Sequence, residues 1–197
     1  YLTATFRRDG TSRLTKENRC APFPSYSAAW TISKEKLFNL PRVNDLKIRG
    51  NWGRLGSSSI GDWDYLGTIN QSIVTVFGGA VVPGSTQVKI VNSGLVWETK
   101  ETVNIGFDAS FLKQRLTLSA EYYHSKTKDV LTDMPIAIST GNQGGAPKAN
   151  AASLKNQGFE LSLGWRYQIG DLKYSAIMNV TTLSNKVIDL GYGKGQV

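Results

Sequence analysis

The stretch Phe159-Glu160-Leu161-Ser162-Leu163-Gly164-Trp165-Arg166-Tyr167-Gln168 alternates apolar and polar residues with a period of two. Successive side chains of a β-strand point to opposite faces, so this pattern predicts a strand with one apolar face and one polar face. A half-buried strand in a soluble sandwich has the same period. Strand length, the placement of aromatic residues and the character of the second face therefore decide which kind of sheet the chain forms.

Seven stretches of the chain show this alternation. They are 1–8, 23–33, 45–54, 97–111, 115–126, 157–169 and 172–185. Most contain about ten residues or more, which is the length of a tilted strand that crosses a bilayer. Strands of soluble proteins are most often about five or six residues long. The pattern predicts an all-β fold: an antiparallel sheet that forms part of the wall of a transmembrane β-barrel.

The connections between these stretches differ in length. Lys113-Gln114, Gly170-Asp171 and the link 34–44 are short and lie at one end of the predicted strands. The long connections follow Arg8, Arg54 and Pro135 and lie at the other end. The segment 55–96 is rich in Gly and Ser and holds only short strand-like pieces, at 72–77 and 87–91. Short periplasmic turns and long extracellular loops are typical of outer-membrane barrels.

The second face of the predicted sheet is strongly polar. Its charged residues are Lys47, Arg49, Asp108, Glu121, Glu160 and Arg166. Such charges are costly in a small dry core, so they favour a wide lumen that holds water or a plug. We therefore expect these six residues to face the lumen. About seven strands cannot close so wide a barrel, which indicates a segment of a larger wall whose outermost strands would be exposed edges.

Composition narrows the possible functions. Hydrophobic residues make up 40% of the chain and charged residues 19%, and the net charge is +8. The basic residues are scattered among strands and loops, which argues against nucleic-acid binding. With one cysteine, Cys20, and one histidine, His124, the sequence offers no zinc site. No run approaches the roughly 20 consecutive apolar residues of a membrane helix.

No pattern of an enzyme or a cofactor site is present. Gly141–Gly145 is glycine-rich but lacks the Lys and Ser/Thr of a phosphate-binding loop. Glu121 and Glu160 have no accompanying nucleophile or partner spacing that would make them catalytic. We expect no enzyme activity and no cofactor.

The best candidates for ligand contact are Asp62, Trp63, Asp64 and Tyr65 in the first long loop. Sugar rings stack on aromatic side chains, and carboxylates accept hydrogen bonds from hydroxyl groups. The alternative is a loop that folds on itself or packs against a lid. The two aspartates alone lack the further oxygen ligands of a calcium site.

The remaining aromatic residues suggest a second pattern. The set Tyr26, Trp30, Trp52, Trp97, Trp165 and Tyr167 is typical of an interfacial belt at the level of lipid headgroups. A platform for carbohydrate is the alternative.

Five segments resemble one family. They are 1–13 (YLTATFRRDGTSR), 23–33 (FPSYSAAWTIS), 46–53 (LKIRGNWG), WET at 97–99 with NIG at 104–106, and 156–162 (NQGFELS). Their order and spacing resemble the C-terminal barrel part of SusC-type (RagA-like) TonB-dependent transporters of the Bacteroidetes outer membrane. Cys20-Ala21 stands where the family commonly has Trp-Gly, and 54–57 departs from its usual Gly-Asn-Gln run.

The resemblance implies that residues 1–197 form part of the barrel domain of such a transporter, without its plug domain or a signal peptide. The barrel implied is the plugged 22-stranded kind. The function implied is import of oligosaccharides or peptides across the outer membrane, with a SusD-like lipoprotein as lid. TonB would act through the absent N-terminal part, and membrane lipid would surround the wall.

The rival interpretation is a soluble all-β module that binds carbohydrate or serves in adhesion. The two differ in what surrounds the apolar side chains, such as those of Phe107 and Leu161. In a membrane barrel these side chains meet lipid, whereas in a soluble module they pack against a second sheet.

Overall fold

The computed structural model describes residues 1–87, 89–140 and 145–191. In chain order, the elements are β1 (Leu2–Gly10), β2 (Cys20–Thr31), the 3-10 helix η1 (Ile32–Lys34), β3 (Val43–Ser57), β4 (Ile69–Phe77), β5 (Ala80–Gln87), β6 (Glu98–Phe111), β7 (Leu116–Asp133), the 3-10 helix η2 (Ile138–Thr140), β8 (Lys148–Ile169) and β9 (Leu172–Asp189).

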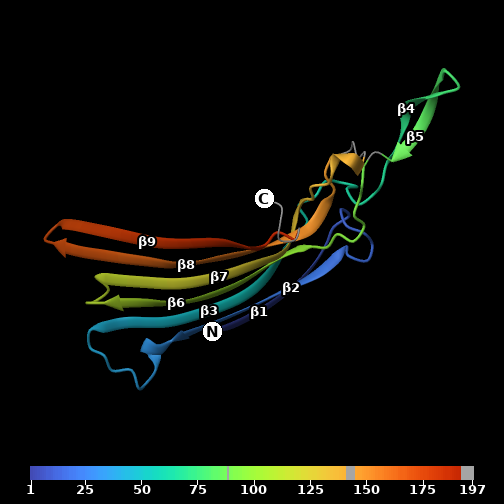
Figure 1. The fold of residues 1–197 in the computed structure, drawn as a ribbon. Coiled ribbons are helices and arrows are strands. Elements are labelled where there is room, and N and C mark those ends of the chain that lie inside the picture. The colour runs from blue at the N-terminus through green and yellow to red at the C-terminus, as the bar shows by residue number, and fades with distance from the viewer. Residues whose placement is uncertain (88, 141–144, 192–197) are drawn as a thin grey trace.

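The strands form one long curved sheet (Figure 1). Seven strands pair in the order β1-β2-β3-β6-β7-β8-β9, and every neighbouring pair is antiparallel. β4 and β5 form a separate hairpin that projects away from the sheet. The sheet is open, with β1 and β9 at its two edges, so the predicted antiparallel seven-stranded wall segment is confirmed.

The two ends of the sheet differ as the sequence predicted. At one end, which we call the turn end, lie the turns 112–115 and 170–171 and the link 32–42. Gly170 adopts a positive φ of 58°, which suits a two-residue hairpin turn. At the other end, the loop end, lie the connections 11–19, 58–97 and 134–147.

Two details of the sequence prediction are wrong. β7 continues past Lys126 to Asp133 and β8 begins at Lys148, because their ladder resumes after irregularities in register near Val130. Of the predicted strand piece at 87–91, Gln87 is the last residue of β5, whose partner is β4, and residues 89–91 are not in a strand. Residue 88 lies outside the described residues. The link 34–44 is irregular after the 3-10 turn Ile32–Lys34 and before β3. Residues 141–144 of the second long loop lie outside the described residues.

The register separates two faces across the whole sheet. One row joins Ile48, Phe107, Ala120 and Leu161, and the adjacent row joins Arg49, Gly106, Glu121 and Glu160. We call these sides the apolar face and the polar face. Within the described residues, no second sheet or helix covers the apolar face, and large side chains there, such as Phe107 and Leu163, are exposed.

The buried hydrophobic cluster of the molecule lies at the loop end instead. Leu14, Ile60 and Leu95 come from the loop-end connections 11–19 and 58–97 and are almost fully buried. Trp97 and Leu131 pack against them, and we call these five residues the loop-end cluster. No helix in the described ranges is long and apolar enough to cross a membrane.

Candidate functional site

The polar face is organised by one arginine. Arg49 on β3 donates from Nε to Asp108 Oδ2 on β6 at 3.2 Å and forms an ion pair through Nη1 with Glu121 on β7. Asp108 also accepts a hydrogen bond from Ser119 Oγ at 2.7 Å. These side chains are only partly exposed, and an ion pair with several hydrogen bonds is more rigid than an isolated surface pair. The network therefore links three neighbouring strands.

Gly106 makes this network possible. It lies between Arg49 and Glu121 in the register, so the arginine must reach across β6. A Cβ atom at this position would lie 3.2 Å from Arg49 Cζ and 2.8 Å from the carbonyl oxygen of Ala120. Glycine leaves the space that the guanidinium occupies. This glycine is the position in the site that sequence analysis missed, because its role depends on which strands flank it.

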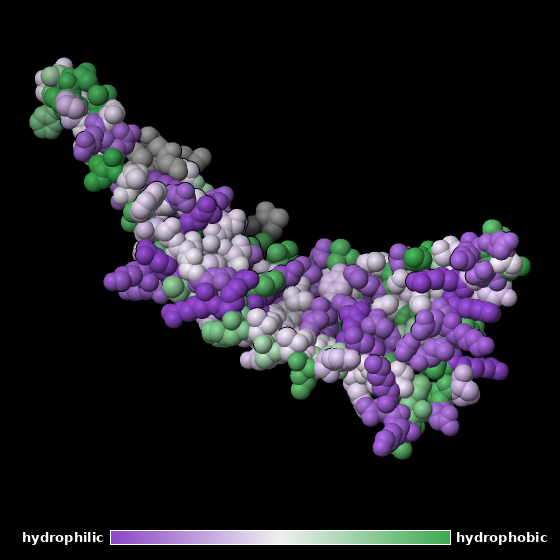
Figure 2. Space-filling model, turned by 180° about the vertical axis from the view of Figure 1, so that it is seen from behind, coloured by the Kyte–Doolittle hydropathy of each residue, from purple (hydrophilic) through white to green (hydrophobic). Residues whose placement is uncertain are grey.

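The other predicted charges share the polar face without joining this network. Glu160 lies directly opposite Glu121, and among the described residues it has no ion-pair partner. Lys47 lies opposite Asp108, and its Nζ is 5.9 Å from the centroid of the Tyr1 ring. Arg166 lies opposite Ser175, towards the turn end. Figure 2 shows that hydrophilic side chains predominate over the sheet when the molecule is seen from behind.

The two aspartates of the candidate loop site already have basic partners. Arg13 Nε donates to Asp62 Oδ1 at 2.9 Å. Asp64 accepts from Lys89 Nζ at 2.7 Å and from the backbone N–H of Gly61 at 2.8 Å. The hydrogen bond from Lys89 lowers the pKa of the Asp64 carboxyl group below its ordinary value, and the Gly61 N–H lowers it further. Both carboxylates therefore help to fold the loop.

The two rings of this loop are in a different situation. Trp63 is 64% exposed and adopts a positive φ of 65°, which is unusual for a bulky residue. Its ring centroid lies 6.4 Å from that of Tyr65, at an interplanar angle of 35°. The four predicted residues are consecutive in one loop, and Trp63 is the ring most open to a ligand, whereas Tyr65 is half-buried.

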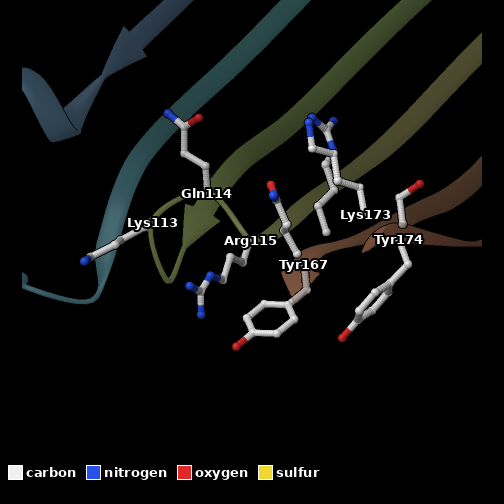
Figure 3. Close-up of a pocket in the computed structure, with 9 residues that line it drawn as sticks. Lys113, Gln114, Arg115, Tyr167, Lys173 and Tyr174 are labelled. Carbon is white, nitrogen blue, oxygen red and sulfur yellow. The ribbon is translucent and has the colours of Figure 1, made fainter. Parts of the chain in front are cut away.

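Some of the aromatic residues of the predicted belt lie together on the apolar face at the turn end. Tyr167 stacks on Trp165 at 6.4 Å and lies 5.9 Å from Tyr174. The Arg115 guanidinium sits 4.4 Å from the centroid of the Tyr167 ring. In Figure 3, Arg115, Tyr167 and Tyr174 point to one side of the sheet, and Gln114 and Lys173 point to the other.

A second aromatic group lies farther towards the loop end, where the Tyr26 and Trp52 rings stack at 5.8 Å. Trp97 does not belong to either group. Its ring packs edge-on against Phe23 at 5.4 Å and within the loop-end cluster, and its Nε1 donates to the carbonyl oxygen of Asn18. That part of the prediction is wrong, because the sequence pattern does not distinguish a belt residue from one in a packed loop.

The described residues contain no group of three or more His, Cys, Asp or Glu side chains that could hold a metal ion. The arrangement instead combines an exposed apolar face, a charged opposite face and folded loops at one end.

The family model "TonB dependent receptor-like, beta-barrel" matches residues 1–196 of this chain. The chain belongs to the TonB-dependent receptor family.

The relatives of this TonB-dependent receptor segment agree with its geometry. It is 34% identical to TonB-dependent receptor SusC of Bacteroides thetaiotaomicron, over 98% of this chain and 20% of SusC. It is 33% identical to TonB-dependent receptor P3 of Formosa agariphila, over 98% of this chain and 19% of that protein. The chain therefore spans about a fifth of the length of the curated relatives it matches.

Solved structures match equally well. The RagAB peptide importer in its closed-closed state superposes with a TM-score of 0.84 and 26% identity, over 98% of this chain and 21% of that chain. The open-open state matches with the same TM-score and 27% identity. The segment is thus SusC/RagA-like.

Family membership decides two of the predictions. Barrels of TonB-dependent receptors reside in the outer membrane, and the family consists of transporters rather than enzymes. The rival interpretation, a soluble carbohydrate-binding or adhesion module, is wrong. The uncovered apolar face gives the physical reason, because a soluble sandwich would cover such a face with a second sheet.

Proposed function

We propose that this segment forms part of the wall of an importer for large nutrients, oligosaccharides or peptides. The observation that carries the proposal is the two-sided sheet. Its apolar side chains are exposed over several strands, and its opposite face carries the Arg49 network. A sheet with these two faces suits a wall between lipid and a hydrated or plugged lumen.

The polar face lines the lumen in this proposal. Lys47, Arg49, Asp108, Glu121, Glu160 and Arg166 would then face water, a plug or a passing substrate. Arg49 neutralises Asp108 and Glu121. Within the described part of the chain, Lys47, Glu160 and Arg166 form no ion pair, so their charges are available to such a partner.

The loop end faces outwards and the turn end faces the periplasm. The aromatic group around Tyr167 and the group around Tyr26 would then mark the two membrane interfaces. The loop-end connections hold the folded cluster and the Trp63 platform, so both are placed where a nutrient arrives.

A SusD-like lipoprotein is the proposed lid, and TonB is the proposed source of energy, through parts of the transporter outside this segment. The β4–β5 hairpin supports a protein partner at the loop end. It projects from the sheet and exposes apolar side chains, with Phe77 80% exposed (Figure 1; Figure 2, upper left). Exposed apolar patches of this kind mark interaction surfaces.

The matched RagAB structures are those of a peptide importer, which makes peptides a candidate cargo here.

Within this importer, the residues 62–65 would capture substrate through their rings. Because Asp62 and Asp64 hold the loop in shape, deleting all four residues would disturb both the fold and the site. A double change, Trp63→Ala with Tyr65→Ala, removes the rings and keeps those contacts.

The experiment uses the full-length transporter in cells that otherwise lack it. Uptake of labelled oligosaccharides and of labelled peptides is measured separately, together with the amount of folded transporter in the outer membrane. We expect the transporter to restore uptake of one cargo class, and the double change to lower that uptake about tenfold at equal protein levels. Trp30→Ala, an exposed tryptophan outside this loop, is the matched control.

Two results would contradict the proposal. Absence of uptake of both cargo classes would remove oligosaccharide and peptide import as the function. Normal uptake by the ring variant would leave import intact and retire the residues 62–65 as the capture site.

A further inference from the structure

A row of charged residues crosses the apolar face near the loop end. The register joins five positions on β3, β6, β7, β8 and β9, one from each strand: Arg54, Glu101, Lys126, Lys155 and Lys186. The alternation of side chains along each strand places these five residues on the same side of the sheet as Trp52 and Phe159, which is the apolar face. Towards the loop end, this face changes from mainly apolar side chains to polar ones, because the adjacent row already holds His124, Gln157 and Ser184.

The charges of this row do not balance. Glu101 accepts from Arg54 at 3.2 Å and has Lys128 at 3.9 Å, so its carboxylate is already occupied. No carboxylate of the described residues forms an ion pair with Lys126, Lys155 or Lys186. Like charges that face each other across strands destabilise a sheet. We call these three residues the lysine row. Its positive charges need an anion that the described residues do not supply.

The depth of the lysine row indicates where that anion would come from. Ten residues of β8 separate Lys155 from Trp165 in the belt at the turn end. At about 3.4 Å per residue and a tilt of about 45°, the two levels lie about 24 Å apart along the membrane normal. The apolar band of an outer-membrane barrel is about 25 Å tall. With the belt at one interface, the lysine row reaches the opposite headgroups.

We propose that the lysine row binds the phosphate groups of an anionic lipid in the outer leaflet. Lysine is a compact charge that pairs well with phosphate, and its aliphatic stem can lie along apolar surface while the ammonium group reaches the headgroup. Lys126 and Lys155 are half-buried and Lys186 is exposed, which fits this geometry. Neighbouring strands are about 4.8 Å apart, so three adjacent ammonium groups can share one or two phosphates.

The inference goes beyond import and concerns only the lipid-facing side. It rests on the proposed contact of the apolar face with lipid, which the Leu161→Arg variant described in the Discussion tests separately. A failure of that contact and a failure of the lysine row are therefore distinguishable.

The test uses the purified full-length transporter in a neutral detergent. Binding of fluorescent lipid A, a phosphorylated glycolipid, is titrated for the wild type and for the triple variant Lys126→Gln, Lys155→Gln, Lys186→Gln. We expect the triple variant to bind roughly a hundredfold more weakly, about fivefold for each lysine. The triple Lys→Arg variant keeps the charges, so it is expected to bind like the wild type.

The matched control changes three lysines that are not on the apolar face: Lys34→Gln, Lys100→Gln and Lys173→Gln. This control variant loses the same three positive charges, and we expect it to bind lipid A as the wild type does. Two competitors identify the source of the phosphate. Phosphatidylcholine should compete poorly because it has no net charge, and inorganic phosphate should compete poorly because it is not held at the interface.

Three results would overturn the inference. Equal binding by the wild type and the triple Gln variant would show that the lysine row does not bind lipid phosphate. Equal weakening by the control triple would assign the effect to net charge alone. Displacement by inorganic phosphate at concentrations near those of lipid A would identify a free anion, and not a lipid, as the ligand.

Discussion

The sheet and the loop end place their apolar side chains in opposite environments. On the sheet, Ile105 and Phe159 stay exposed on a face that no other described element covers. At the loop end, Leu14 and Leu95 are 0% and 1% exposed within a packed cluster. The hydrophobic effect acts in both regions, but what surrounds the apolar side chains differs. Lipid covers the apolar face in the proposed orientation, whereas the loops surrounded by water must bury their own apolar groups.

The polar groups differ between the two regions in the same way. On the sheet, they gather on one face and pair across strands, as Arg49 does with Asp108. At the loop end, they join segments that are distant in sequence, as when Asn150 of β8 bonds both the N–H and the carbonyl of Val96 in the connection 58–97. The wall is therefore stabilised by the lipid around its apolar face, whereas the loop end is stabilised by contacts among its own residues. Three variants test this difference.

The largest effect is expected from a charge on the apolar face. Leu161→Arg should cost about 2 to 4 kcal/mol at midplane depth, because a guanidinium would replace an aliphatic group in hydrocarbon. The amount of folded full-length transporter in the outer membrane measures this, and it should fall sharply. Ser162→Arg, on the polar face of the same strand, is the control and should assemble normally. Equal assembly of both variants would show that this face does not meet lipid.

A smaller effect is expected at the loop end. Leu14→Ala leaves a cavity in the loop-end cluster and should destabilise it by about 2 to 3 kcal/mol, towards the low end for buried leucines because loops can partly collapse. Hydrogen exchange of residues 11–19 should become faster, while the sheet keeps its protection. Leu37→Ala, at a position that is 98% exposed, should change nothing. Faster exchange throughout β6 and β7 would mean that the two regions are not independent.

The smallest effect concerns pH. Because the Lys89 contact lowers the pKa of Asp64 in the folded state, its stabilisation is fully present above the unfolded value of about 3.9 and is lost as the pH falls through the lower folded value. Asp64→Asn should therefore loosen residues 58–68 at neutral pH, by less than about 1 kcal/mol, and should not do so in strong acid. Protease cleavage of this loop as a function of pH measures the difference. An Asp64→Asn variant that cleaves like the wild type at every pH would contradict this role for Lys89.

The candidate site was only partly predictable. The alternation of residues placed Arg49, Asp108 and Glu121 on one face, because a strand has a period of two. Their pairing across three strands, with Gly106 beneath the guanidinium, depends on β3 lying beside β6 although 58–97 separates them in sequence. The residues 62–65 were recognised by residue type, but the ion pairs that occupy Asp62 and Asp64 depend on Arg13 and Lys89, which lie in other segments.

Local periodicity and short motifs were enough to predict the strands, their two faces, the long and short connections and the resemblance to SusC-type barrels. Only the folded structure shows which side chains meet across strands. It extended β7 and β8 through a shared ladder, moved Trp97 from the belt to the loop-end cluster and aligned Lys126, Lys155 and Lys186 in one row. The physical reason is that register and loop packing are fixed by contacts between residues far apart in the chain, which local patterns do not contain.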